Sequence, residues 1–493
     1  MDEARNEMRK EDLIFGLDIG ASKINLFVGM VDGASVRVLE CGDFPLTNAD
    51  EFDHVVETLK NAAQSIESTV GVDVHDVYVG IAGKHVSSFN YRGLITLPTG
   101  EVRSQDIETV KDQASTIPES AGQIIHVFPG EYTLDDQPGI RNPKGLNGRR
   151  LGVEVQVVTS RPNAIQNLDK CVKSAGLHTM EFVLEPLAAA YAVLTEDEKE
   201  LGVALIDIGA GSADVAVFVG ESVRYTVSLD LAGNSITSDI SKCLQVPISL
   251  STAEEIKKKY GTCKINNLIE DETFPVPGVG DRGDVQCSRK LLARVITARV
   301  AEIFKMLSDD LQKHKIDGLI NGGIVLTGGG AELVNFVTLF KEMSGYEVRK
   351  GYPRFMFSAP MGSGVYSTAA TSALGMVLAA KDDRLPDCVS LPPKEEEVPE
   401  EELVDLEVTD ETPLANSITD EEMESGETGN LIAPDEFGEP VKKEKNSRTV
   451  KVKKSSFMNM AWKKVKDSMK HGALKFYDDA NREENENMEE NQL

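Results

Sequence analysis

The sequence predicts an α/β protein built from two related halves, and a repeated segment carries this prediction. The stretch Leu205–Phe218 has the pattern of a strand, a tight turn of small residues and a second strand. The stretch Gly16–Val28 has the same pattern, and four of its residues match the later copy: Asp18, Ile19, Gly20 and Ala21 correspond to Asp207, Ile208, Gly209 and Ala210. An internal repeat points to a duplicated fold, so we expect each half to present one hairpin to a shared cleft.

Both turns have the composition of an anion site. Glycine lets backbone N–H groups approach an anion closely, and a carboxylate at the end of a strand can hold a water bound to a metal ion. Lys23, directly after the first turn, is placed to direct its ammonium at a phosphate. The alternatives are an ordinary hairpin with a polar tip and a solvated turn lysine, and the turns alone leave them open.

Composition indicates a multidomain globular chain with an unusual C-terminal end. The 493 residues are enough for two or more domains, and 41% of them are hydrophobic. The formal net charge is −29, and residues 387–440 hold 19 acidic residues against one lysine. The acidity is therefore mainly a property of one segment. From the strongly negative net charge we expect no nucleic-acid partner.

Cysteine usage and hydropathy indicate the compartment. The six cysteines are scattered without metal-type spacing, which predicts free thiols in a reducing cytoplasm. The first 12 residues are polar and charged, unlike a signal peptide. No apolar run reaches the ~18 residues that span a membrane.

The first half begins with strands and one helix. Apolar runs predict strands at Ile14–Asp18, Ile24–Val31 and Val36–Glu40, followed later by a buried strand at Asp76–Gly83. Between them, apolar residues at helical spacing predict a helix over Asp50–Ser68. This order gives a β-rich start to the fold.

Residues 86–165 interrupt this order and predict a small inserted α+β module. Prolines and glycines in His126–Leu151 argue for turns and short strands rather than a helical crossover, and Gly152–Thr159 alternates like a strand. His126 has no accompanying serine or cysteine nucleophile motif. A histidine in the core or at a strand edge is therefore favoured over a catalytic base.

Two common nucleotide-binding motifs are disfavoured. The chain contains no Walker A pattern, which argues against a P-loop NTPase. A GxGxxG run at Gly278–Gly283 follows Pro275 and Pro277 without a preceding strand. A dinucleotide site of the Rossmann type needs that strand, so this run is read as a loop.

Two predicted helices follow the inserted module, and the second has a carboxylate at its N-terminus. Asn163–Ala175 has apolar residues on one face, and Glu185–Leu194 is a helix of small residues able to pack closely on a neighbour. Glu185 stands at the N-terminus of that helix, just before Pro186. Its carboxylate is either favoured there by the helix dipole or orients a water for phosphoryl transfer.

The second half continues with loops that lead into helices. Ala232–Asp239 is a loop entering a helix, and Ser251–Gly261 is a helix capped by its first serine or by Thr252 and ended by its glycine. Glu254 and Lys257 share a helix face, and they either grip a ribose or base edge or form a surface ion pair. Further elements are a long helix at Leu291–His314, a strand with a triple-glycine turn and helix start in Gly323–Leu333, and an alanine-rich helix at Ser367–Ala380.

Taken in order, several of these segments resemble the five signatures of the actin/Hsp70/sugar-kinase ATPase superfamily. The matching segments are Asp18 with Gly20, Glu185–Tyr191, Asp207 with Gly209 and Gly211, Gly328–Gly330, and the final alanine-rich helix. Within that superfamily, the chain resembles the FtsA family of bacterial actin-like cell-division proteins. The features typical of that family are Gly139–Gly148, the inserted module and Val276–Gly280. The resemblance covers about residues 12–380 and the far C-terminus.

The resemblance implies a two-lobed, actin-like ATPase fold with duplicated ribonuclease-H-like halves around a cleft for ATP and Mg²⁺. Asp18 and Asp207 would lie by the metal ion and its waters. Glu185 matches the acidic position that Hsp70-like members place near the attacking water. Because members of the family are poor ATPases, we expect at most a weak ATPase, in which ATP is mainly a switch for polymerisation. The residues implied to line the nucleotide are Gly20, Ala21, Ser22, Lys23, Gly209, Ala210, Gly211, Ser212, Gly233, Asn234, Glu254, Lys257, Gly328, Gly329 and Gly330.

The same resemblance divides the chain into four subdomains and a C-terminal region. The expected bounds are 12–85 with 166–198 for subdomain 1A, 86–165 for the SHS2-like subdomain 1C, 199–231 with 306–385 for 2A, and 232–305 for 2B. Residues 386–440 are acidic, dotted with proline and poor in aromatics, so we expect a disordered linker over 386–452. A membrane-binding helix at 456–477 and an acidic tail at 478–493 complete the chain.

The predicted anchor helix carries its own chemistry. Residues 442–475 hold 12 basic residues against two acidic ones. Apolar residues and lysines take opposite faces of a helix: Met458, Trp462, Val465, Met469 and Phe476 against Lys463, Lys464, Lys466 and Lys470. A basic amphipathic helix of this kind favours an anionic membrane surface. Docking on the body and a calmodulin-like target are the alternatives.

These expectations combine into one functional prediction. The chain is predicted to polymerise at the cytoplasmic face of the bacterial inner membrane at the division site, and to tether the tubulin-like FtsZ ring there. The resemblance implies that the FtsZ tail docks on residues 232–305, with Arg282, Arg289 and Arg294 as candidate contacts, and that later division proteins also bind. A sugar-kinase-like enzyme would leave the inserted module and the anchor helix unexplained. An Hsp70-like chaperone would need a β-sandwich where the acidic linker lies.

Overall fold

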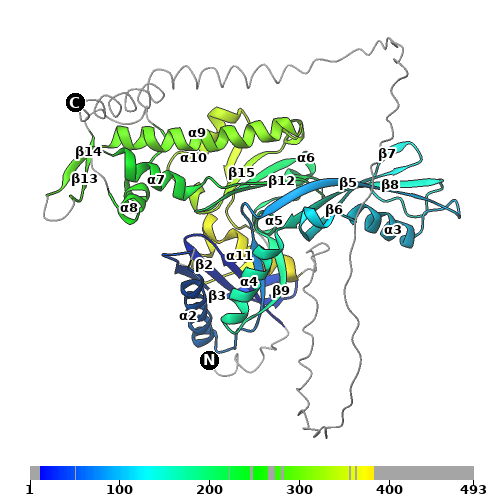
Figure 1. Cartoon of the computed structure of the whole chain (residues 1–493), viewed down its shortest axis with the longest axis horizontal. Coiled ribbons are helices and arrows are strands. Elements are labelled where there is room, and N and C mark those ends of the chain that lie inside the picture. Colours follow the sequence, from blue (N-terminus) through cyan, green and yellow to red (C-terminus); the bar gives the residue numbers. More distant parts are fainter. Residues whose placement is uncertain are drawn as a thin grey trace, which may run out of the picture. The chain divides into compact units, whose positions relative to one another are not determined.

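The computed structural model places the predicted body in one compact unit. It describes residues 12–49, 51–220, 222–244, 248–264, 272–278, 283–354, 357–360 and 363–381, and Figure 1 shows their elements in colour. The predicted linker, anchor helix and acidic tail lie outside the described residues, as do Arg282 and the middle of the 278–283 motif.

The first half is built on a six-stranded sheet. Its strand order is β17 (Phe357–Ser358), β3 (Ser35–Pro45), β2 (Lys23–Asp32), β1 (Leu13–Ile19), β4 (Asp76–Ile81) and β9 (His178–Leu184). The strands β1, β2 and β3 form an antiparallel meander, whereas β4 runs parallel to β1 and β9 runs parallel to β4. The short β17 comes from far along the chain and pairs in parallel with β3.

The second half repeats this arrangement in a five-stranded sheet. Its strand order is β12 (Ser222–Leu229), β11 (Ala213–Val219), β10 (Val203–Ile208), β15 (Gly323–Thr327) and β16 (Val348–Lys350). Here β10, β11 and β12 form the meander, and β15 and β16 follow in parallel. Because strand order and directions match those of β3-β2-β1-β4-β9, the predicted duplication is confirmed.

Two apolar helices join the halves. The helix α5 (Glu185–Val193) contacts strands of both sheets, and it packs on α11 (Thr371–Lys381), which contacts β1, β2 and β4. Both helices are buried almost all round, as their small and apolar residues require. The last helix begins at Thr371 rather than at the predicted Ser367, because two 3₁₀ turns precede it, η5 (Gly364–Tyr366) and η6 (Thr368–Ala370). Ser367 instead caps η6 by accepting the N–H of Ala369 at 3.1 Å.

The other elements cover the two sheets or extend the second half. In the first half these are α2 (Phe52–Val70), which packs on β2 and β3, and α4 (Pro162–Ser174). After them come α6 (Glu196–Leu201), α7 (Gly233–Cys243), α8 (Leu250–Tyr260), the hairpin β13 (Thr273–Val276) with β14 (Val285–Ser288), α9 (Arg289–Lys313), η3 (Asp317–Leu319), η4 (Gly329–Glu332) and α10 (Phe336–Ser344). The helix α9 runs across the expected boundary between residues 305 and 306, and the subdomain bounds stay predictions.

The cap predicted for α8 is wrong. Ser249, and neither Ser251 nor Thr252, is the N-cap, because its hydroxyl accepts the N–H of Thr252 at 3.1 Å. The prediction missed it because three candidate hydroxyl residues stand within four positions. The predicted end is right, since α8 stops at Tyr260 and Gly261 follows as its C-cap.

The inserted module is a four-stranded sheet with one helix. Its strand order is β5 (Val86–Thr96), β8 (Arg150–Ser160), β6 (Gln123–Leu134) and β7 (Gln137–Ile140). The helix α3 (Ser104–Ser115) packs on β5 and β8, as Figure 1 shows, and a 3₁₀ turn, η2 (Glu119–Ala121), leads into β6. The prediction of short strands is wrong here, because β6 runs for 12 residues through Pro129, with a bulge between Pro129 and Tyr132.

Each of these parts has its own apolar core. The first core includes Leu17, Phe27 and Leu59, and the second, under α9 and α10, includes Phe274, Phe336 and Phe340. The third fills the space between the inserted sheet and α3 and is rich in valine. Among the helices that the structure describes, none combines the length and hydropathy needed to cross a bilayer.

The contact between α5 and α11 depends on Gly375. A Cβ atom added there would lie 1.8 Å from the carbonyl oxygen of Ala188. We expect Gly375→Leu to lower the free energy of unfolding by about 3 kcal/mol or more, since neither helix can move without disturbing a sheet. Urea denaturation followed by circular dichroism measures the loss. In Gly318→Ala, where no atom lies within 4 Å of the added Cβ, the change should stay within about 0.5 kcal/mol. Equal stability of the two variants would contradict the close helix contact.

Candidate functional site

The two predicted hairpin turns have the same backbone geometry. In the first, the N–H of Gly20 donates to the carbonyl of Lys23 at 3.0 Å, and in the second, the N–H of Gly209 donates to the carbonyl of Ser212 at 2.9 Å. Each turn follows a buried central strand, β1 or β10, and leads into the next strand of the meander. The repeat in the sequence is therefore a repeat in structure.

Each hairpin carries a polar pair whose members flank its turn. Asp18 lies opposite Asn25, and Asp207 lies opposite Asp214. The amide of Asn25 donates to Oδ2 of Asp18 at 3.2 Å. The other carboxylate oxygen of Asp18, Oδ1, is buried and has no hydrogen-bond partner among the residues that the structure describes. The hydroxyl of Ser372, from α11, donates to Oδ2 of Asp207 at 2.9 Å. Buried carboxylate oxygens without a partner are costly, so Asp18 has an acceptor available for a ligand.

The two halves meet at these turns. The N–H of Gly83, after β4 of the first half, donates to Oδ1 of Asp214 in the second half at 3.1 Å. The hydroxyl of Ser212 donates to the other oxygen of Asp214 at 2.5 Å. A Cβ atom added to Gly211 would lie 2.9 Å from Cβ of Ala21. The first and second turns therefore face each other at van der Waals distance.

The carboxylates form a cluster that raises its own pKa values. Burial is the main cause for each of them, and the charges of the neighbouring carboxylates add to it. The pKa of Asp207 rises to about 7, and the pKa of Glu185, at the start of α5, rises well above its usual value. Lys23 lowers the pKa of Asp18 and Asp207 through its charge, although its ammonium is also bound to Asp43 at 2.7 Å. Perturbed carboxylates gathered in this way are typical of a functional site.

The triple-glycine turn after β15 lies directly on the second hairpin. Gly328 has φ +82°, and a Cβ atom there would lie 2.2 Å from Oδ1 of Asp207. A Cβ atom at Gly330 would lie 2.5 Å from the side chain of Ile208, whereas Gly329 has more room, with its nearest neighbour 3.8 Å away. A side chain at Gly328 or Gly330 would therefore push this turn off the hairpin.

The start of α7 and one face of α8 join the second turn. The N–H of Gly233 donates to the carbonyl of Gly209 at 3.1 Å, and the N–H of Asn234 donates to that of Ala210 at 2.7 Å. From α8, the ammonium of Lys257 donates to the carbonyl of Gly233 at 3.0 Å and pairs with Glu254 at 2.6 Å. The ion pair that sequence reasoning left open is thus present, but it is partly buried against the turn rather than free on the surface.

The structure brings nearly all the predicted site residues together. The first turn, with Gly20 to Lys23, faces the second, with Gly209 to Ser212. Gly233, Asn234 and Lys257 adjoin the second turn and Gly328 approaches Asp207, whereas Glu185 lies beside Gly80 of β4. Sequence reasoning missed Asp214, Ser372 and Asn25. One signal could have found the strand pair, since Asn25 follows Asp18 and Asp214 follows Asp207 at the same spacing of seven. No such signal exists for Ser372, which comes from a distant helix.

Other candidates lie away from this site. His126 is fully buried in β6, and its Nε2 accepts the N–H of Leu184 at 3.0 Å, which fits the predicted core role. The predicted membrane-contact residues, from Met458 to Phe476, fall outside the described residues. Within the described part of the chain, no group of three or more His, Cys, Asp or Glu side chains is arranged to hold a metal ion by itself.

Comparison with known proteins agrees with this architecture. Residues 204–375 match the model of the family described as cell division protein FtsA, and residues 83–159 match the SHS2 domain inserted in FtsA. A solved structure of a PilM-PilN type IV pilus biogenesis complex shares the fold, with a TM-score of 0.53 at 18% identity, covering 75% of this chain and 98% of its own.

Two relatives give the relation at the level of sequence. The chain is 39% identical to cell division protein FtsA of Pseudomonas aeruginosa over 69% of its own length and 83% of that protein. It is 34% identical to cell division protein FtsA of Escherichia coli over 69% of its length and 84% of that protein. With its actin-like duplicated halves and inserted SHS2 module, the chain belongs to the FtsA family of cell-division proteins.

Proposed function

We propose that this chain binds ATP with Mg²⁺ against the two hairpin turns and uses the nucleotide as a switch. One observation carries the proposal: two glycine-containing turns of the same geometry face each other, and each follows a carboxylate, the half-buried Asp18 or the buried Asp207. Backbone N–H groups at such turns suit phosphate oxygens. The first phosphate loop would be Gly20 to Lys23, and the second would be Gly209 to Ser212.

The adenosine side of the nucleotide would lie on the elements that adjoin the second turn. The proposed residues are Gly233, Asn234, Glu254, Lys257, Gly328, Gly329 and Gly330. Their support is the chain of hydrogen bonds that ties α7 and α8 to the turn, together with the close approach of Gly328 to Asp207. Glu254 and Lys257 already satisfy each other, so a ribose would add to their ion pair rather than replace it.

Asp18 and Asp207 fit a magnesium ion held largely through water. Mg²⁺ prefers oxygen ligands, keeps several of its waters and is usually bound by one or two carboxylates together with phosphates. The partnerless Oδ1 of Asp18 is an acceptor of the required kind, and the mutual repulsion of the carboxylates would be relieved by a cation. The ion would neutralise phosphate charge.

Glu185 would serve a slow hydrolysis at most. Its pKa is raised well above the usual value by burial and by Asp18, Asp214 and Asp207. Only the ionised carboxylate can accept a proton from water, so a raised pKa limits Glu185 as a general base. This supports a role for ATP as a switch for polymerisation more than as a substrate.

We further propose that the chain links an FtsZ polymer to the cytoplasmic face of the inner membrane at the division site. Family membership supports the setting in cell division, and the basic amphipathic pattern of residues 456–477 supports the membrane contact. Later division proteins are further proposed partners. The subdomain bounds given above are proposed along with this function.

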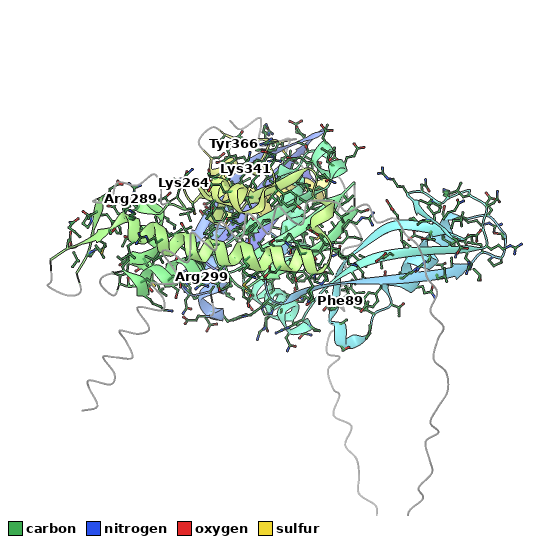
Figure 2. The ribbon with its side chains drawn as sticks, turned by 90° about the horizontal axis from the view of Figure 1, so that it is seen from above. Phe89, Lys264, Arg289, Arg299, Lys341 and Tyr366 are labelled. Atoms are coloured by element: carbon green, nitrogen blue, oxygen red, sulfur yellow. The ribbon has the colours of Figure 1, made fainter. Side chains whose placement is uncertain are left out.

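The FtsZ tail would bind the face formed by residues 232–305. Figure 2 labels two arginines of α9 on this part of the chain, Arg289 and Arg299. Both are engaged, since Arg289 pairs with Glu272, and Arg299 donates to both oxygens of Asp239 at 2.6 and 2.9 Å. Arg294 is exposed on the same helix. Of the two candidate contacts that the structure describes, Arg289 and Arg294, Arg294 is therefore better placed to bind an acidic tail.

The nucleotide proposal is tested by Asp207→Asn. Folding raises the pKa of Asp207 from 3.8 to about 7, so the folded chain binds this proton more tightly than the unfolded chain does. The carboxylate therefore destabilises the nucleotide-free protein increasingly as the pH rises from about 4 to 7. We expect Asp207→Asn to have a higher free energy of unfolding than the parent. This gain should be about 2 kcal/mol larger at pH 8 than at pH 5.

The same variant should lose affinity for ATP·Mg²⁺ by about 10- to 100-fold, because it removes a charge next to the metal waters. Calorimetric titration measures the affinity, and urea denaturation at the two pH values measures the stability. Asp32→Asn, an exposed aspartate at the end of β2, should change neither quantity. Unchanged ATP affinity in Asp207→Asn would refute the proposed site.

A charge reversal tests the FtsZ contact. Arg294→Glu should weaken binding of a peptide with the sequence of the FtsZ C-terminal tail by about fivefold, the effect of about 1 kcal/mol of surface electrostatics. Fluorescence anisotropy measures the affinity, and the effect should shrink at high salt. Lys313→Glu makes the same reversal at the far end of α9 and should leave binding unchanged. If both variants bind the peptide equally well, the contact lies elsewhere.

Vesicle sedimentation tests the anchor helix. A chain ending at Asp435 should stay in the supernatant with vesicles containing anionic phosphatidylglycerol, whereas the full chain should sediment. Each lysine near such a surface contributes about 1 kcal/mol, so the full chain should also release from the vesicles as salt is raised. Vesicles of phosphatidylcholine alone are the control. Sedimentation of the shortened chain to the same extent would show that the helix is not the anchor.

A further inference from the structure

A cavity lies between the inserted module and the second sheet. Its volume is about 590 Å³, and its walls come mainly from β5 and β12, with Gln156 of β8 and the residues around Pro186. β5 and β12 are each the outermost strand of their sheet. The hydroxyl of Ser88 donates to the carbonyl of Thr226 at 2.7 Å and so links the two strands. Figure 2 labels Phe89, the next residue of β5, which also lines the cavity.

One face of the inserted sheet supplies polar groups to this cavity. Asn90 lies opposite Gln156, and Ser88 lies opposite Val158. Because side chains alternate along a strand, these residues share a face, and Tyr91, Val155 and Val157 take the other. Val155 and Val157 belong to the apolar core under α3 and Tyr91 packs against it, whereas Ser88, Asn90 and Gln156 are not part of that core. Because β5 is an edge strand, Phe89 and Tyr91 also line the cavity.

Three buried polar atoms in the cavity wall have no hydrogen-bond partner of good geometry within the described residues. Oγ of Ser228 lies beside Asp214, whose pKa it lowers, and the other two are Oε1 of Gln156, a residue only 5% exposed, and Oγ1 of Thr226, a residue only 6% exposed. Leaving such an atom unpaired costs about 1–3 kcal/mol, and native proteins seldom accept that cost without a use. The other walls are largely apolar, including Leu184, Pro186 and Val215. Apolar walls with a few directed polar atoms are characteristic of a ligand pocket.

We propose that this cavity is a regulatory site for a small, flat, uncharged ligand that donates an O–H or N–H hydrogen bond to Gln156. The rings of Tyr225 and His314, whose centroids are 5.0 Å apart, line one side and suit an aromatic ligand. The apolar walls disfavour charge. Asp214, the carboxylate in the wall, offers little to a cation, because Gly83 and Ser212 already bind both of its oxygens.

The site is separate from the proposed nucleotide residues but touches their support. None of the residues predicted to line ATP lines the cavity, whereas Asp214 does. Asp214 binds Ser212 of the second turn and Gly83 of the first half. A ligand that fixes β5 and β12 around Asp214 therefore favours the same joined arrangement of the halves as ATP does. This coupling, unlike the binding site itself, rests on the proposed function.

Two neutral fluorescent probes test the site on the full chain: 2-naphthol, which has an O–H donor, and 2-methoxynaphthalene, which has nearly the same shape without it. Fluorescence titration should give a Kd for 2-naphthol about fivefold lower than for 2-methoxynaphthalene, the effect of one hydrogen bond to a buried acceptor. Gln156→Met keeps the volume and should abolish this preference. Equal binding of the two probes to the parent chain, no binding of either, or an unchanged preference in Gln156→Met would overturn the proposal.

A filled cavity gives the second arm. Asn90→Trp places a large ring on the cavity face and should raise the Kd for both probes at least tenfold. Leu94→Trp places the same ring on the same strand at an exposed position outside the cavity wall, and should leave binding intact. Circular dichroism confirms that both variants fold. Undiminished binding in Asn90→Trp would mean that the probes bind elsewhere and would refute the site.

Adding ATP·Mg²⁺ to the titration tests the coupling. The Kd for 2-naphthol should fall by about fivefold or more, the lower range of coupling between two sites. ATP binding is measured calorimetrically on the same sample. If ATP binds without changing the Kd for 2-naphthol, the regulatory role is wrong. If ATP does not bind at all while the Gln156 preference persists, the nucleotide proposal fails and the cavity site stands.

Discussion

The constraint on which this structure depends is the burial of like charges where its two halves meet. Burial raises the pKa values of Asp18, Asp207, Asp214 and Glu185, and the charge of Asp214 adds to the rise for the other three. The fold offsets this cost with hydrogen bonds from Asn25, Ser372, Ser212 and the N–H of Gly83. Two of these bonds cross between elements distant in sequence. The cluster therefore holds the halves together and also keeps the nucleotide-free protein in an energetically unfavourable charge state, which a cation can relieve.

Close backbone contacts position that cluster. Gly375 lets α11 pack on α5, and Gly16 lets α11 approach β1, where an added Cβ atom would lie 2.4 Å from the carbonyl of Ala373. These contacts fix Ser372, which binds Asp207, and Glu185, which begins α5. Gly328 then brings the triple-glycine turn onto Asp207. Small residues at these crossings matter because larger ones would separate the charged groups from their hydrogen-bond partners.

Much of this could be predicted from sequence, where the signal is local or repeated. The matching hairpins predicted two related halves, and the glycine turns predicted which residues lie together. The inserted module was predicted from its break in pattern, but the length of β6 was missed, because a bulge can carry Pro129 through a strand. Asp214 was hidden inside a β-prone run, and Ser372 has its role only through packing of a distant helix. The cavity beside Gln156 was not predictable either, since its walls come from separate sheets.

The short strand β17 and the helix α11 have a consequence for how the protein is made. β17 is a strand of the first sheet and α11 packs on that sheet, although they begin 173 and 187 residues after the end of β9. At roughly 5–20 residues per second, a ribosome needs about 10–40 s to deliver them after β9 has emerged. During that time β3 has an unpaired edge and β1 lacks the helix that covers it. The nascent first half is thus exposed to association with other chains until the second half is complete, and this protein should depend on chaperones that shield unfinished sheets during translation.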